Sequence, residues 1–263
     1  MSQFNGKHQS YLEEKFQSRV SFHKTERILY GHDIAALPSL VRPLLRKTIP
    51  DAVVQPETEQ ELIELARWAK ENNIPLTPRG KASSGYGGVL PVKQGVVVDF
   101  YRMNRTIRID PDGLTAMVQA GVVWEKLDQV LGQRGLTLRL YPSSYPSSTV
   151  GGWLAQGGAG IGSYESGWFR DNVVSTRVVL PNGEVKEFKG QDLDFISEVE
   201  GITGLISEVT LRVQLLEELE VISIGSPKAH DFQQLAQSLI DRKLFIDQRL
   251  CKTLKIVRIG RAD

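Results

Sequence analysis

The sequence predicts an α+β domain built as two lobes with a binding site between them. Two glycine-rich runs, at residues 78–88 and 142–163, are each flanked by apolar segments of strand-like composition. Helical and strand-like segments alternate before residue 100, whereas several short strand-like segments follow one another after residue 106. The change in pattern indicates two differently built layers, because each layer must bury its own apolar face.

The first lobe is predicted to contain one amphipathic helix between short strands. Residues 1–47 are polar and mixed, with a helical stretch around residues 11–20, and are interpreted as a structural arm. Thr58 and Glu61 form a capping-box pattern that opens the helix, which ends near residues 72–73. Apolar runs at 74–77 and 96–100 predict strands. The apolar face of the helix carries Leu62, Ile63, Leu65, Ala66 and Ala69.

The second lobe is predicted to be mainly β. Residues 181–184 separate two apolar segments, and the Asn182-Gly183 pair within them predicts a two-residue hairpin turn. A further strand and a helix are expected after residue 214, where the composition shifts again. The strands predicted after residue 100 cover 106–109, 115–121, 136–138, 173–180, 185–188, 209–213 and 217–224, and the helices cover 123–131 and 229–241.

Both glycine-rich runs indicate a polar ligand lying directly against the main chain. Glycine loses much conformational freedom on folding, so a run of it usually has a structural or binding role. Consecutive N–H groups in the run at 78–88 can bind phosphate oxygens, and Arg79 and Lys81 add positive charge. The run is neither a Walker loop nor a dinucleotide fingerprint, since it lacks the Gly-Lys-Ser/Thr triplet and a helix directly behind it. The alternative is that both runs are flexible surface loops.

Six segments in a fixed order resemble a known family, at residues 50–56, 78–88, 148–162, 170–174, 179–184 and 200–207. They are similar to the FAD-binding, PCMH-type domain of the vanillyl-alcohol oxidase and para-cresol methylhydroxylase superfamily. The similarity is strongest to its glycolate oxidase and D-lactate dehydrogenase branch. The resemblance implies an FAD-binding domain at 48–214. Residues 215–263 would then be the beginning of a truncated α+β, ferredoxin-like cap domain or a partner-contacting tail.

The resemblance also implies which residues contact FAD. In this alignment the run at 148–152 meets the ribityl chain and pyrophosphate, Gly157 and Gly158 lie beneath the isoalloxazine, and the segment around Gly204 meets the adenine side. The full implied set is Pro78, Arg79, Gly80, Lys81, Ala82, Ser83, Ser84, Tyr86, Pro142, Ser143, Ser148, Thr149, Gly151, Gly152, Ala155, Gly157, Gly158, Gly160, Gly204 and Ile206.

Some of these positions depart from the family pattern or have simpler interpretations. Lys81 and Ala82 stand where most relatives carry glycine, and their side chains restrict positive φ. Thr149 fits a helix N-cap equally well. Valine at Gly151 or Gly157 is expected to reduce FAD content greatly, with occupancy lost before the fold is. Two further expectations are that Trp153 packs in the core rather than stacking on the flavin, and that Arg170 and Asp171 form a buried salt bridge that orients their loop rather than a catalytic pair.

The implied function is that of an FAD-linked oxidoreductase whose flavin accepts a hydride from a 2-hydroxy acid or a related alcohol. No catalytic residue is identified, because relatives draw the general base from the cap. Residues 78–88 contain no histidine or cysteine, so the FAD is expected to be noncovalent. One alternative is an FAD-carrying electron-transfer subunit of an iron–sulfur complex, and another is a cofactor-free scaffold or nucleotide-binding module.

Composition excludes several other classes of protein. The formal charge of +1 gives no reason to expect nucleic acid as a partner, and no apolar run is long enough to span a membrane. The single cysteine, Cys251, cannot form an internal disulfide or hold an iron–sulfur cluster alone. Four scattered histidines show no metal-ligand spacing, so no metal site is expected. We therefore expect a small-molecule substrate and a cytoplasmic location. An iron–sulfur cluster, if one is used, is expected on a partner subunit.

Overall fold

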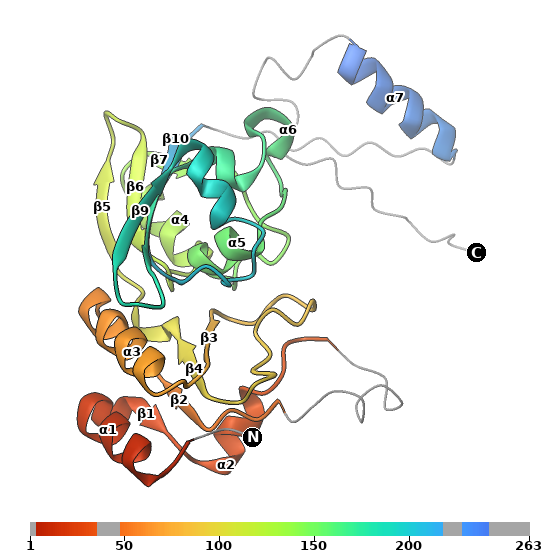
Figure 1. Cartoon of the computed structure of the whole chain (residues 1–263). Helices are drawn as coiled ribbons and strands as arrows, with labels where there is room; N and C mark the ends of the chain where they lie inside the picture. The colour runs from red at the N-terminus through yellow and green to blue at the C-terminus, as the bar shows by residue number, and fades with distance from the viewer. Residues whose placement is uncertain (1–3, 36–47, 218–227, 242–263) are drawn as a thin grey trace.

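The computed structural model describes residues 4–35, 48–217 and 228–241 of the 263-residue chain, and these form two stacked lobes and an outlying helix (Figure 1). The N-terminal lobe has one small sheet with helices beside it, and the second lobe has a larger antiparallel sheet. Both lobes share one continuous set of buried apolar residues. The predicted α+β fold in two lobes is therefore confirmed.

The sheet of the first lobe has the strand order β1-β2-β4-β3. Strands β2 and β3 run parallel to β4, while β1 pairs antiparallel with β2. The centre of the sheet is apolar because Val96, Val97 and Val98 of β4 are fully buried. The strands of this lobe are β1 (Val20–Ser21), β2 (Ala52–Val54), β3 (Leu76–Arg79) and β4 (Val96–Asp99), and its helices are α1 (Gly6–Phe16), α2 (Lys24–Leu29) and α3 (Glu59–Glu71).

Two details of this lobe differ from the sequence-based expectation. The arm helix starts at Gly6 rather than near residue 11, because the Asn5 side chain caps it by accepting from the Lys7 and His8 amides. The capping box of α3 is only half formed. Thr58 accepts from the Glu61 amide as predicted, but the Glu61 carboxylate accepts from the Glu57 amide instead of returning to Thr58.

The larger sheet of the second lobe has the order β5-β6-β10-β8-β9, with β7 also paired to β10, and every pairing is antiparallel. Trp153 of α5 stacks on Phe169 at 4.5 Å, and Trp124 meets both rings edge-on, so the expected core role of Trp153 is confirmed. The strands are β5 (Thr106–Asp110), β6 (Thr115–Gln119), β7 (Leu136–Leu138), β8 (Val173–Val179), β9 (Val185–Lys189) and β10 (Leu205–Leu215), and the helices are α4 (Trp124–Gly132), α5 (Val150–Gln156) and α6 (Ser163–Ser166).

The predicted two-residue turn between β8 and β9 is wrong. The two strands do form a hairpin, but only Gly183 has positive φ (76°), whereas an Asn-Gly turn of that type needs positive φ at both residues. The Leu180 amide donates to the Glu184 carbonyl, which makes the turn longer. The expected helix at 229–241 is present as α7 (Ala229–Asp241). Most of the strand predicted at 217–224 lies outside the described residues.

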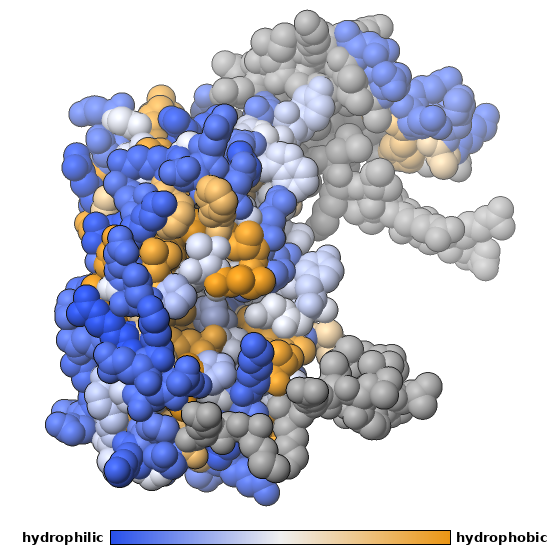
Figure 2. Space-filling model, viewed as in Figure 1, coloured by the Kyte–Doolittle hydropathy of each residue, from blue (hydrophilic) through white to orange (hydrophobic). Residues whose placement is uncertain are grey.

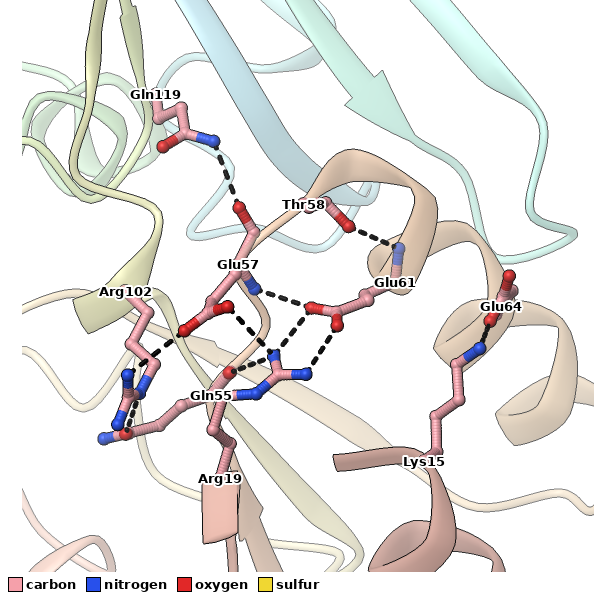
Figure 3. A network of polar contacts seen from close by, with 9 residues as sticks. All are labelled: Lys15, Arg19, Gln55, Glu57, Thr58, Glu61, Glu64, Arg102 and Gln119. Carbon is pink, nitrogen blue, oxygen red and sulfur yellow. Dashed lines mark hydrogen bonds and ion pairs between the residues drawn. The ribbon is translucent and has the colours of Figure 1, made fainter. Parts of the chain in front are cut away.

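Polar side chains tie the arm and the second lobe to the start of α3 (Figure 3). Arg19 donates to both carboxylate oxygens of Glu61, at 2.8 and 2.6 Å, and to the Gln55 carbonyl. From the second lobe, Gln119 donates to the Glu57 carbonyl at 3.3 Å. The segment between β2 and α3 is thus held from both sides.

A second polar contact links α3 directly to the larger sheet. The Glu59 carboxylate accepts two hydrogen bonds from Arg177 of β8, at 2.9 and 2.6 Å, and one from the Ser207 hydroxyl of β10 at 2.6 Å. A bidentate arginine–carboxylate pair has a defined geometry as well as charge. These three bonds fix how the first lobe is oriented against the second.

We expect this contact to make stability depend on acid pH. Hydrogen bonds from Arg177 hold the pKa of Glu59 below its usual 4.5, although burial acts in the opposite direction. A lowered pKa in the folded state adds stability that is fully present above pH 4.5 and is lost as the pH falls through the folded-state pKa. Urea unfolding between pH 7 and pH 3 should therefore show a smaller loss of unfolding free energy in Glu59→Gln. The exposed Glu14→Gln is the control, and an identical pH profile in all three proteins would contradict the expectation.

Candidate functional site

Three segments far apart in the sequence meet at the junction of the two lobes. They are the loop after β3, the start of α5, and the turn before β10. A Cβ atom built on Gly80 would overlap Oγ1 of Thr149, and one on Gly201 would lie 2.8 Å from the Pro78 ring. A Cβ on Gly88 would overlap the carboxylate of Glu200. The two glycine-rich runs and the Glu200 segment, which the sequence only suggested were related, are therefore in contact.

The loop after β3 presents a row of free backbone donors. Among the residues that the structure describes, the N–H groups of residues 80–85 have no hydrogen-bond acceptor, either backbone or side chain. Consecutive backbone N–H groups of this kind form a concave site for anions. The loop is thus suited to hold a phosphate-bearing group without any further charged side chain.

The two cations of this loop do not both face outward. Arg79 donates to the carbonyl oxygens of His32, at 2.8 Å, and Tyr30, at 3.4 Å, and its guanidinium lies 5.0 Å from the centre of the Tyr30 ring. Lys81 is exposed, with its ammonium 4.5 Å from the centre of the Tyr101 ring. Arg79 therefore binds backbone carbonyls of the protein itself, whereas Lys81 lies at the surface of the loop.

Ala82 adopts the backbone conformation that its side chain disfavours. Its φ is 51°, and its methyl group is buried, with 7% of the residue exposed. An L-residue in this region costs about 1 kcal/mol relative to glycine. Ala82 thus adopts the positive φ that its side chain restricts, and its methyl group is buried by the surrounding residues.

Thr149 serves as the N-cap of α5 as well as contacting the first loop. Its hydroxyl accepts from the Gly152 amide at 3.2 Å, and the residue is 3% exposed. Ser148, also buried, accepts a hydrogen bond from Ser144 through its hydroxyl at 2.8 Å. The alternative interpretation of Thr149 as a helix cap is confirmed, and it is compatible with a place at the site.

Asp128 of α4 organises the loop that leads into α5. Its carboxylate accepts hydrogen bonds from the hydroxyls of Thr137, Tyr141 and Tyr145, at 3.2 to 3.3 Å. Burial, together with the negative charge of Asp128, raises the pKa of Tyr141 to about 12, so this phenol stays protonated and keeps donating. Asp128 was not identified from the sequence, because no motif marks a carboxylate that accepts from residues 9 to 17 positions later.

Several predicted glycines are required by internal packing. A Cβ on Gly151 would lie 2.5 Å from the Ala120 side chain and 2.9 Å from its carbonyl oxygen, which puts α5 in direct contact with the end of β6. A Cβ on Gly157 would overlap Glu198, and one on Gly160 would overlap the Tyr141 carbonyl. Gly204 similarly lies against Val179. Valine at Gly151 or Gly157 would press on these neighbours, so we expect it to strain the fold as well as to lower FAD occupancy.

The turn before β10 adds acidic groups that the sequence-based site omits. Glu198 and Glu200 both have positive φ, 64° and 52°, and the Glu200 amide donates to the Ala155 carbonyl at 2.9 Å. Burial raises the pKa of the Glu200 carboxyl above its usual 4.5. This turn links α5 to the loop after β3 and carries a carboxyl group between them.

The remaining predicted residues lie around this junction and differ in burial. Pro142 and Ser143 lie on the loop held by Asp128, Gly152 and Gly158 are not buried, and Ile206 is buried in β10. Ser83 and Ser84 are half-buried within the first loop, whereas Tyr86 is 81% exposed. Figure 2 shows apolar and weakly polar residues gathered across the middle of this face, between mainly hydrophilic surfaces on both lobes.

Arg170 and Asp171 form an ion pair at 3.6 Å, but their side chains are 34% and 48% exposed, so the expectation of a buried pair is wrong. Arg170 also pairs with Asp194. Within the described residues, no three His, Cys, Asp or Glu side chains are grouped to hold a metal ion. None of the helices described is both long enough and apolar enough to cross a membrane.

Comparisons with known proteins agree with this architecture. A family model described as an FAD binding domain matches residues 50–189. The chain is 35% identical over 185 residues to mitochondrial D-lactate dehydrogenase [cytochrome] of Arabidopsis thaliana, covering 67% of this chain and 32% of that protein. It is 31% identical over 197 residues to glycolate oxidase subunit GlcD of Bacillus subtilis, covering 71% of this chain and 40% of that protein.

Solved structures of alkyldihydroxyacetonephosphate synthase share the fold. One matches with a TM-score of 0.71 at 27% identity, covering 81% of this chain and 42% of that one. Another matches with a TM-score of 0.78 over 92% of this chain, at 24% identity. The chain thus spans less than half the length of the relatives named here. By sequence and fold, the chain belongs to the FAD-binding domain family of FAD-linked oxidoreductases, and its cofactor is FAD.

Proposed function

We propose that this chain is the FAD-binding part of an oxidoreductase that takes a hydride from a 2-hydroxy acid or a related alcohol. The observation that carries the proposal is the row of N–H groups at residues 80–85 that face no acceptor among the described residues, next to Thr149 and Glu200. Such a row suits the pyrophosphate of FAD. Two relatives named for D-lactate and glycolate support the substrate class.

In this proposal the chain's residues bind and orient, while the bound flavin supplies the hydride-accepting ring. Residues 80–85 would hold the pyrophosphate, with Lys81 adding charge at its surface. The start of α5, from Ser148 to Gly152, would lie along the ribityl chain, and the segment at 204–206 would face the adenine side. Trp153 of α5 is buried and stacks on buried Phe169, which packs the helix against the core of the second lobe.

The substrate class is tested by anaerobic mixing of the flavin-loaded protein with glycolate and with D-lactate. Bleaching of the flavin band at about 450 nm by either acid would support the proposal, since that band belongs to the oxidised cofactor. A flavin that dithionite reduces, but that neither acid bleaches in the full-length protein, would contradict the assigned substrate class. An FAD-carrying electron-transfer subunit is the less favoured alternative, because relatives are named as enzymes that act on substrates.

We expect the FAD to be bound without a covalent link. Residues 78–88 contain no histidine or cysteine that could attack the flavin ring. Precipitating the purified protein with acid should therefore release all the yellow colour to the supernatant, and the denatured chain should have its unmodified mass. Flavin that remains with the pellet after washing would contradict this prediction.

An iron–sulfur protein as electron acceptor and a cytoplasmic location are further parts of the proposal. The chain has one cysteine and cannot hold such a cluster by itself, so a partner would supply it. Purification of a tagged chain from its own cells, followed by iron analysis of the copurifying proteins, tests the partner. Cell fractionation tests the location, for which the mitochondrial relative offers the competing outcome.

A further inference from the structure

A short segment of the N-terminal arm contacts both ends of the first glycine-rich loop. This segment, residues 30–35, is named here the strap, and it follows directly after α2. Its own position is set by the Tyr30 hydroxyl, which donates to the Asp99 carboxylate at 2.7 Å. Asp99 ends β4, is 5% exposed, and also accepts from Gln55 at 2.8 Å. The strap therefore starts from a buried anchor in the sheet.

The strap holds the beginning of the loop through Arg79. This arginine ends β3 and donates to the strap carbonyls of Tyr30 and His32, with its guanidinium over the Tyr30 ring. An arginine that donates to backbone carbonyls and lies over an aromatic ring has few orientations left. The backbone at the point where the loop leaves β3 is thereby fixed.

The strap holds the far end of the loop through Asp33. One carboxylate oxygen of Asp33 accepts from the Gly87 amide, and the other accepts from the Ala35 amide, both at 2.8 Å. The Ala35 methyl lies 3.6 Å from the position of a Cβ on Gly85, so the strap also lies against the loop there. The carboxylate uses the Gly87 donor, which leaves the N–H groups of residues 80–85 as the ones that face no described acceptor.

We propose that the strap positions the loop for FAD, with Asp33 as its main positioning residue. The loop is held at Arg79 and at Gly87, and the donors between these two points converge only while both ends are fixed. Loss of the Asp33 contact frees the far end, so the loop must be ordered when FAD binds, and that ordering lowers affinity. The inference concerns cofactor binding and does not depend on the proposed substrate.

The test is titration of the full-length apoprotein with FAD, followed by flavin fluorescence. Asp33→Ala should raise the dissociation constant at least tenfold. Asp33→Asn should restore part of the affinity, because its carbonyl oxygen can still accept from Gly87 whereas its amide nitrogen cannot accept from Ala35. The matched control is Asp112→Ala. Asp112 is exposed in the turn between β5 and β6 and makes no hydrogen bond or ion pair with other described residues.

A second readout separates positioning from general destabilisation. Hydrogen exchange of the apoprotein should be faster in peptides covering residues 80–90 of Asp33→Ala, with no change in the larger sheet or in the melting temperature. If Asp33→Ala does not fold, Tyr30→Phe provides the same comparison, since it removes only the hydroxyl bond to Asp99. Its expected effect is a rise in the dissociation constant of about threefold.

An unchanged dissociation constant in folded Asp33→Ala would overturn the proposal. So would a loss of affinity that Asn does not restore and that accompanies a lower melting temperature, because that pattern indicates a purely structural role. Failure of the wild-type chain to bind FAD would instead contradict the cofactor assignment. Failure of glycolate and D-lactate to reduce the flavin would leave the strap unaffected.

Discussion

Valine in place of Gly80 should weaken FAD binding about 100-fold, which corresponds to about 2.8 kcal/mol. The new side chain would occupy the space of the Thr149 hydroxyl, which its cap bond from Gly152 holds in place, so we expect the first loop to move away from α5. That movement displaces the row of N–H groups at residues 80–85, and it also disturbs the cap of α5, which depends on the same hydroxyl. The measurement is the FAD dissociation constant of the purified apoprotein.

Gly132→Val is the control for this variant. Gly132 ends α4, and a Cβ there would meet nothing within 4 Å, so the same chemical change has no steric consequence. The control should bind FAD with an affinity within about threefold of wild type. If Gly80→Val bound FAD as tightly as the control, the contact between the two glycine-rich runs would have no role in holding the cofactor.

Valine in place of Gly151 should destabilise the fold itself by about 2 to 3 kcal/mol, whether or not FAD is present. The valine would press against the side chain and carbonyl of Ala120, and a backbone neighbour cannot rotate out of the way. Urea unfolding of the apoprotein measures the effect. Any loss of bound flavin in this variant would then be a consequence of the destabilised fold.

The same helical control, Gly132→Val, separates overpacking from the change in helix propensity, which by itself favours valine over glycine. Gly151 and Gly132 both belong to helices, but only Gly151 faces a residue outside its helix, Ala120, which follows directly after β6. A midpoint of urea unfolding that is the same in both variants would contradict the packing argument. It would also indicate that Gly151 is needed only for contact with the cofactor.

Much of the fold follows from local patterns in the sequence. Thr58 caps α3 because a threonine hydroxyl before a helical pattern accepts from an amide three residues later, and this interaction needs no distant partner. The β-branched run in β4 and the segments of the larger sheet are similarly local signals. The glycine-rich runs were recognisable for the same reason, since glycine is costly wherever it has no role.

The two-lobed α+β architecture, the family and the two runs that meet at the site could all be predicted from patterns along the chain. The role of each residue at the site depends instead on contacts between distant segments. Arg79 donates to the strap, and Gly151 packs against Ala120. Asp33 and Glu200 contact the first loop from distant segments of the chain. Periodicity and caps depend on neighbours within a few residues, whereas these contacts join residues 30 to more than 100 positions apart. Such pairs exist only once the chain has packed.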